Sequence, residues 1–327
     1  MTRRWLFEMA SELSERLGFT LDVDPFLGEM ARLRFSDGQV CYLSQDAYDV
    51  NSGVSTELLR MPALCMQFLT ASGLPVPEFG WVSAEAASEA FEQSARIAER
   101  LGYPVILRSS GKPGVGPFLA TDSEILADLV AQVLELAPAV MIQRPVWGSQ
   151  VTVVLYGGDV CFAFERHPWR VVGDGQRSVQ QLLEANREQE PGITLAAEDW
   201  RIDDMLEFAR RARSTVPAPG EVVQLALKPS LAHGGRVRAI AGEIDPSLAE
   251  LARSAIRQSG LTFGAVDLVT EARGAWLLDV QPAPDLEPYL ALGPAARRNV
   301  SLLLKRLLLD TRASSRPSPM PASGRAE

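Results

Sequence analysis

The chain has little histidine and little cysteine. Of its 327 residues, two are histidine and three are cysteine. His167 and His233 stand in no catalytic motif, which disfavours a Ser-His-Asp triad and a histidine-rich metal site. The cysteines are far apart and form no CxxC pair, so a disulfide framework and a zinc site are disfavoured too. We expect Cys41, Cys65 and Cys161 to be buried apolar thiols.

Positive charge and long apolar runs are also missing. The formal net charge is −9, which disfavours a chain-wide electrostatic attraction to nucleic acid. No apolar run approaches the roughly 18 residues of a membrane span. The N-terminal arginines are soon followed by Glu8, Glu12 and Glu15, which is not the pattern of a signal peptide. We expect a cytoplasmic protein that binds neither nucleic acid nor membrane.

What the chain does have is a mixture of helix and strand patterns in irregular order. A hydrophobic content of 46% with 22% charged residues is typical of a globular protein with a sizeable core. Thr121 with Glu124, and Ser178 with Gln181, form capping boxes that predict two helix starts. Because no regular βαβ alternation is visible, the pattern predicts an α+β fold in several lobes. Apolar periodicity further predicts helices over 4–17, 55–72, 83–101, 246–259 and 299–309, and hairpins over 30–44 and 263–281.

The first candidate for chemistry is the stretch "VILRSSGKPGVGPF". A predicted strand carries Arg108 into a loop that contains Lys112, Gly114 and Gly116. Glycines let a backbone approach phosphate groups closely, and cations neutralise those groups. No GK[ST] opens a helix, so this is not a Walker A loop. The alternative is a glycine-rich hairpin with solvated charges.

The second candidate is an acidic pair on the predicted hairpin 263–281. Asp279 and Gln281 are two residues apart, so both side chains lie on one face of a strand. Asp267 on the partner strand brings a third oxygen donor to that face. Such a set suits Mg²⁺, which takes few protein oxygens and leaves room for phosphates. The alternatives are a worn copy of a metal site and polar residues lining a water-facing strand.

The third candidate is "RHPWR", in which Arg166 and Arg170 flank a stiff Pro-Trp pair. Guanidinium groups placed in this way are suited to clamping a carboxylate or a phosphate through paired hydrogen bonds. An ordinary surface loop is the alternative.

Taken in order, these stretches resemble the ATP-grasp superfamily, and within it the ligase domain of cyanophycin synthetase. The most specific stretch is "VVGDGQRSVQQLLEANRE", supported by "SLAHGGRVRAI" and "GLTFGAVDLVTEARGAWLLDVQPAPDL". Glutathione synthetase and D-alanine–D-alanine ligase are more distant members. The resemblance runs from about Leu58 to Leu309.

The resemblance implies an α+β fold in which two lobes hold ATP between them. It implies an ADP-forming carboxylate–amine ligase that uses Mg²⁺, forms an acyl phosphate and acts on an amino acid or a short peptide. Phosphate binding falls to Arg108, Lys112, Gly114 and Gly116, and the metal to Asp267, Asp279 and Gln281. The adenine hinge is implied at Gln143, Arg144, Pro145 and Val146, a further ATP contact at Gln150, and the acceptor site at Arg166 and Arg170.

The sequence departs from the family pattern at several of these positions. Asp279 stands in place of a glutamate, Gln281 in place of an asparagine and Arg108 in place of a lysine. Thr152 stands where an arginine is expected, and Met61-Pro62 where the family has an Asp-Lys pair. The alternative is therefore a catalytically degenerate ATP-grasp protein that binds nucleotide or peptide as a regulatory or scaffolding partner.

The resemblance and the composition together divide the chain into three parts. Residues 1–57 form a small N-terminal α/β segment, 58–310 the ATP-grasp domain, and 311–327 a tail rich in Ser, Pro, Ala and Arg that we expect to be disordered. ATP-grasp ligases are often dimers or tetramers, so a homo-oligomer is one of the expectations. The domain itself divides into lead-in helices (58–102), a phosphate-loop lobe (103–146) and a C-terminal lobe (147–310).

Overall fold

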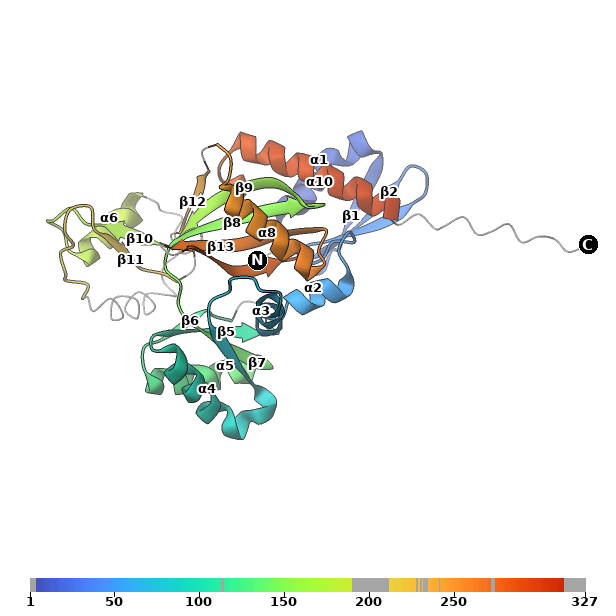
Figure 1. Cartoon of the computed structure of the whole chain (residues 1–327). Coiled ribbons are helices and arrows are strands. Elements are labelled where there is room, and N and C mark those ends of the chain that lie inside the picture. Colours follow the sequence, from blue (N-terminus) through green and yellow to red (C-terminus); the bar gives the residue numbers. More distant parts are fainter. Residues whose placement is uncertain are drawn as a thin grey trace, which may run out of the picture.

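The computed structural model describes residues 4–112, 115–189, 212–227, 229, 231, 235–240, 242–271 and 274–314. These residues form three main antiparallel sheets, each with its own helices, and a smaller two-stranded unit. The mixture confirms the predicted α+β class. In Figure 1 the four-stranded lobe lies below the five-stranded sheet, and the two-stranded unit extends to the left. No helix in the described ranges has the length and apolarity needed to cross a membrane.

The five-stranded sheet is the centre of the large lobe, and helices cover both of its faces. One face packs against α3 (Pro62–Ala71) and α8 (Pro246–Ser259) through residues such as Val153 and Leu268. The other face packs against α10 (Pro294–Ser314) and the N-terminal segment. The strand order is β12 (Arg236–Ala239), β9 (Asp159–His167), β8 (Ser149–Tyr156), β13 (Phe263–Glu271) and β14 (Gly274–Gln281).

The small lobe is a four-stranded sheet with two helices. Its core is formed by α4 (Ala87–Leu101) and α5 (Ser123–Leu136), whose apolar faces pack on the strands. The strand order is β4 (Phe79–Ser83), β7 (Ala139–Gln143), β5 (Val105–Ser110) and β6 (Phe118–Ala120). The chain leaves this lobe after β7 and enters the large lobe at β8.

The N-terminal segment shares its core with the large lobe. It consists of α1 (Arg4–Leu17) and a three-stranded sheet of β1 (Phe19–Val23), β2 (Met30–Phe35) and β3 (Val40–Ser44). Its buried side chains belong to the same apolar cluster as residues of β9, β13 and α10. The cluster includes Leu6, Met9 and Leu33 on one side and Phe164, Phe263 and Leu304 on the other.

Short elements connect these lobes. α2 (Gly53–Leu59) joins the N-terminal segment to α3, a 3₁₀ turn (Ala84–Ala86) precedes α4, and α9 (Glu287–Leu290) precedes α10. The two-stranded unit pairs β10 (Arg170–Val172) with β11 (Val222–Gln224) and packs on α6 (Val179–Gln189).

Several predicted elements are confirmed and some are not. The helix over 4–17 and the hairpins over 30–44 and 263–281 are present, and the Ser178–Gln181 capping box forms through bonds of 2.9 and 3.3 Å. The helix expected over 55–72 is instead two helices. Pro62 occupies the first turn of α3, where its missing N–H costs nothing, so the break falls directly before it.

The structure differs from the sequence predictions at three further places. The N-cap of α5 is Asp122, not Thr121, because its carboxylate accepts from the N–H groups of Glu124 and Ile125 at 3.0 Å. Strand β1 was not predicted. Helix α10 continues to Ser314, so residues 311–314, expected in the tail, are helical. The remainder of the tail, 315–327, lies outside the described residues.

Candidate active site

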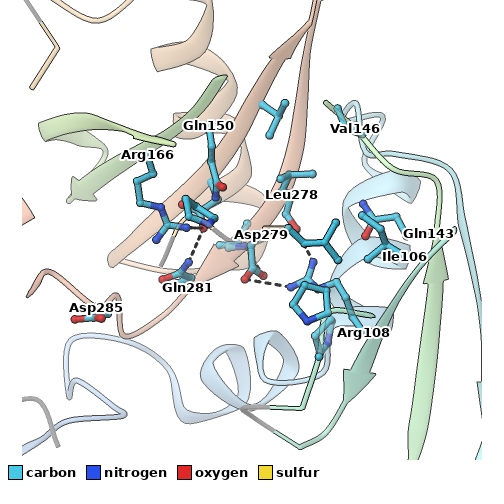
Figure 2. Close-up of a pocket in the computed structure, with 18 of the residues that line it drawn as sticks. Ile106, Arg108, Gln143, Val146, Gln150, Arg166, Leu278, Asp279, Gln281 and Asp285 are labelled. Atoms are coloured by element: carbon cyan, nitrogen blue, oxygen red, sulfur yellow. Dashed lines mark hydrogen bonds and ion pairs between the residues drawn. The ribbon is translucent and has the colours of Figure 1, made fainter. Parts of the chain in front are cut away.

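A cavity of about 1000 Å³ lies between the small and large lobes (Figure 2). Strands β5 and β7 contribute one wall, and β8, β9, β13 and β14 contribute the other. The structure brings most of the predicted site residues together in this lining: Arg108, Lys112, Gly116, Gln143, Arg144, Val146, Gln150, Arg166, Asp267, Asp279 and Gln281.

Two predicted residues are not part of the lining, and a third is not described. Arg170 lies on β10, where its side chain is exposed, and the structure does not place it at the cavity. Pro145 is buried and is not among the lining residues. Gly114 lies outside the described residues, as does His233.

The two carboxylates face each other across the hairpin, as predicted. Asp267 on β13 is the register partner of Asp279 on β14, next to a bulge in the pairing. Gln281, two residues further on, pairs with Ala265 and turns its amide toward Asp267. The antiparallel ladder therefore fixes all three side chains on the cavity side of the sheet.

Asp267 is the more deeply buried acid, and three side chains hold it. It is 3% exposed. Its Oδ1 accepts a bond of 2.6 Å from the Thr152 hydroxyl. Its Oδ2 accepts from Arg166 at 3.1 Å and from the Gln281 amide at 2.8 Å. Thr152 reaches it because β8 lies beside β13, with Thr152 and Asp267 in register.

Asp279 pairs with a cation from the opposite lobe. Arg108 on β5 lies 3.3 Å from the Asp279 carboxylate and donates to the Leu278 carbonyl at 2.9 Å (Figure 2). Desolvation raises the pKa of Asp279, Arg108 opposes that rise, and the nearby Asp267 adds to it. This interaction is a polar contact between the small lobe and the edge of the large one.

The charges at the cavity floor therefore balance. Two aspartates face two arginines, and within the described ranges no group of three or more His, Cys, Asp or Glu side chains forms a metal-binding cluster. The donor set is nonetheless compatible with a hard cation, since two carboxylates and one amide on the same face are oxygen donors of the type Mg²⁺ prefers. For these oxygens to bind a metal, the arginines must exchange partners.

Polar groups without partners mark where an anion fits. The Nε atoms of Arg144 and Arg166 are buried, and neither has a hydrogen-bond partner among the described residues. A buried donor without a partner costs about 1–3 kcal/mol, and an anionic ligand would satisfy it. Gln143 and Gln150, 5% and 9% exposed, add buried amides to the same lining (Figure 2).

The connection between the lobes is anchored by residues that the sequence did not indicate. Glu271 accepts from the Trp147 N–H and from the Trp276 indole, both at 3.0 Å. The Arg144 guanidinium lies 5.1 Å from the centre of the Trp276 ring. At Gly148 a Cβ would lie 2.1 Å from the Thr270 carbonyl oxygen, so only glycine fits. The glycine was the only signal in the sequence, because the contacts of Trp147 with Glu271 and of Arg144 with Trp276 join segments more than 100 residues apart.

Comparison with known proteins gives the fold a name. Residues 76–149 match the family model described as "Carbamoyl-phosphate synthase L chain, ATP binding domain". Cyanophycin synthetase from Nostoc sp. is 25% identical over 268 residues, 76% of this chain and 29% of that protein. D-alanine–D-alanine ligase from Gloeobacter violaceus is 32% identical over 119 residues, 36% of this chain and 38% of that protein.

Solved structures extend the match over most of the chain. A bifunctional glutathione synthetase from Pasteurella multocida superimposes with a TM-score of 0.55 at 17% identity, covering 93% of this chain and 44% of that one. D-alanine–D-alanine ligase from Bacillus anthracis gives a TM-score of 0.53 at 12% identity, covering 81% and 70%. The chain has the ATP-grasp fold of these ligases. The fold predicted from the resemblance is confirmed. The chain spans less than a third of the length of the cyanophycin synthetases it matches.

Proposed function

We propose that this chain is an ATP-dependent carboxylate–amine ligase that acts on an amino acid or a short peptide. The observation that carries the proposal is the facing pair Asp267 and Asp279 at the floor of an interlobe cavity, with cationic side chains opposite. This is where an ATP-grasp ligase binds the triphosphate and its metal. The products are ADP, phosphate and an amide, formed through an acyl phosphate that an amine displaces.

The lining offers distinct surfaces for the parts of ATP. The proposed base site is lined by Gln143 at the end of β7, by Arg144 and Val146 directly after it, and by Ile106 and Leu278. Arg108, Lys112 and Gly116 line the proposed phosphate site. Arg108 carries a delocalised charge on a planar fork, which binds a phosphate through two bonds at once.

The metal in this proposal is Mg²⁺, held by Asp267, Asp279 and the Gln281 amide oxygen. When bound there, Mg²⁺ neutralises charge on the phosphates and so favours phosphoryl transfer. Thr152 orients the Asp267 carboxylate through its 2.6 Å bond. Arg166, whose Nε has no hydrogen-bond partner among the described residues, is proposed to orient the acceptor carboxylate or the acyl phosphate. Arg170, exposed on β10, is proposed to act in the acceptor site only if the two-stranded unit closes over the cavity.

A second function, nucleotide binding without turnover, is favoured by the charge balance at the cavity floor. Arg108 and Arg166 already neutralise both carboxylates, at 3.3 and 3.1 Å. A metal must displace them, and a site that binds nucleotide without metal has no route to phosphoryl transfer. In that role the protein would act as a regulatory or scaffolding partner of another enzyme.

Release of ADP distinguishes the two functions. The purified chain is incubated with ATP, Mg²⁺ and pools of amino acids or short peptides, and ADP is followed by a coupled assay. A ligase releases ADP above background only with ATP, Mg²⁺, a carboxylate and an amine together. Asp267→Asn should reduce that rate by about 10²-fold or more, since it removes an anionic ligand of the proposed Mg²⁺, whose charge stabilises the transition state.

The matched control is Asp128→Asn, because Asp128 is an exposed residue of α5 outside the cavity. Undiminished turnover in Asp267→Asn would contradict the assignment of the metal site. Binding of a non-hydrolysable ATP analogue without any ADP release across all pools would favour the second function.

A further inference from the structure

The two edge strands of the N-terminal sheet, β1 and β3, differ in how deeply their inward side chains are buried. On β3 the inward side chains of Cys41 and Leu43 are 3% and 5% exposed. On β1 the inward side chains become more exposed along the strand: Phe19 is 6% exposed, Leu21 is half-buried and Val23 is 38% exposed. The apolar face of the sheet is thus unfinished at the β1 edge.

The backbone hydrogen bonds between β1 and β2 show which backbone groups of β1 face outward. Asp24 N–H donates to the Met30 carbonyl and Ser36 N–H donates to the Gly18 carbonyl. Alternate residues of an antiparallel strand point to the same neighbour, so Thr20 and Asp22 also bond to β2. The N–H and C=O groups of Phe19, Leu21 and Val23 therefore face away from β2. Among the described strands, only β2 pairs with β1.

Large apolar side chains project beside this open edge. Phe26 and Leu27, in the loop after β1, are 91% and 68% exposed. The loop is held in shape by Asp24, whose carboxylate accepts from both of their N–H groups at 3.1 Å. An open strand edge next to exposed apolar residues is the usual feature of a surface that pairs with another chain.

We propose that two copies of the chain pair through β1, antiparallel, about a twofold axis at Leu21. Leu21 of each copy then exchanges both backbone hydrogen bonds with Leu21 of the other, and Phe19 does so with Val23. The three-stranded sheets join into one continuous sheet whose apolar sides lie on the same face. The half-covered side chains of Leu21 and Val23 are buried against Leu21 and Phe19 of the other copy.

The outer face of this junction pairs polar groups and directly opposes no like charges. Thr20 of one copy lies opposite Asp22 of the other, and a hydroxyl beside a carboxylate is a favourable cross-strand pair. Asp22 is already paired with Arg32 at 2.7 Å, and Thr20 has Arg34 as its register partner. Across the junction the order is therefore Arg32 and Asp22 of one copy, followed by Thr20 and Arg34 of the other. No like charges are directly opposed. The equivalent β3 junction offers no such pair, since Tyr42 would face itself.

The pairing leaves the cavity open and does not depend on the proposed function. No residue of β1 lines the cavity, whose nearest N-terminal lining residue is Asp46, beyond β3. Both active sites of the dimer would remain accessible.

Cross-linking tests the register directly. In a hydrogen-bonded antiparallel pair the two Cα atoms at the twofold axis lie about 5.5 Å apart, within disulfide range. Leu21→Cys should therefore form a dimer in near-complete yield on mild oxidation, seen on a non-reducing gel. Thr20→Cys is the matched control, because its equivalent lies beyond the roughly 7 Å limit. Both are made in a Cys161→Ser background, since Cys161 is only partly buried.

Mass measurement tests the dimer without a cross-link. The full chain should have twice its 35.6 kDa in light scattering. Leu21→Pro removes an N–H that faces outward, so β1 keeps its bonds to β2 and the chain should become a folded monomer with an unchanged circular dichroism spectrum. Tyr42→Pro makes the same change at the β3 edge and should leave the dimer intact. A monomeric wild-type chain, or equal cross-linking at positions 20 and 21, overturns the proposal.

Discussion

Replacing Asp279 by asparagine should have opposite effects on nucleotide binding with and without Mg²⁺. Arg108 is paired with Asp279, so the carboxylate and a phosphate would compete for the same cation. Asp279→Asn removes the competitor and should tighten binding of a non-hydrolysable ATP analogue in EDTA. The same change removes a proposed metal ligand and should weaken binding in Mg²⁺.

The size of the effect follows from the ion pair. At 3.3 Å, two unit charges attract by about 5 kcal/mol in a medium with an effective dielectric constant of about 20. The two side chains are 23% and 27% exposed, so water screens part of this attraction. Desolvation offsets more of it, and a net value of about 1–2 kcal/mol is reasonable. That corresponds to binding about 5- to 30-fold tighter in EDTA.

Calorimetric titration measures both conditions. Asp285→Asn is the matched control, since Asp285 lines the same cavity, carries the same charge and forms no ion pair within the described ranges. It should change both affinities by less than about threefold. Unchanged or weaker binding of Asp279→Asn in EDTA would show that Arg108 is not a phosphate ligand.

Two further predictions concern buried side chains behind the site. Asn51 bonds with the backbone of Thr262, Phe263 and Pro282 at 2.8–3.1 Å, so Asn51→Ala should lower the free energy of unfolding by about 2–4 kcal/mol in urea. A loss below 1 kcal/mol would contradict this. Burial, more than any charge, raises the pKa of Cys65 to about 12, so the folded state favours the protonated thiol. Its contribution to stability should fall as the pH rises from the ordinary thiol pKa of 9.0 toward 12, and Ellman's reagent should not react with it near pH 8 unless the chain is denatured. Rapid labelling of the native chain at Cys65 would refute the burial.

The site was predictable where a single hairpin determines the geometry. The facing of Asp267 and Asp279 follows from two short strands joined by a tight turn, and the register confirms it. The pairing of Arg108 with Asp279 was not predictable, because it depends on how two lobes with separate cores approach each other. Arg170 was predicted to share the acceptor site with Arg166, but Arg166 lies on β9 and Arg170 begins β10 in the two-stranded unit, and the structure does not bring Arg170 to the cavity.

The fold was predictable in its class and in its longer helices. The helices predicted over 4–17 and 246–259 correspond directly to the observed bounds of α1 and α8. Strand β1 was missed because five residues with one buried side chain carry almost no alternation. Helix α10 extends beyond its predicted end at Leu309. Thr311 is a polar residue and was therefore assigned to the tail, but it is buried, with 8% of its surface exposed.

The apolar cluster that joins the N-terminal segment to the large lobe bears on how the chain unfolds. Phe164 and Phe263 pack in the same core as Leu6 and Leu33, so neither part can lose its packing while the other keeps it. These two parts should melt together in one cooperative transition. The small lobe has a core of its own, so calorimetry should show it unfolding in a separate transition at lower temperature. A bound nucleotide should raise that temperature until the small lobe unfolds together with the other two parts. A fragment that begins at residue 58 would expose aromatic side chains of the large lobe to water and should aggregate on expression.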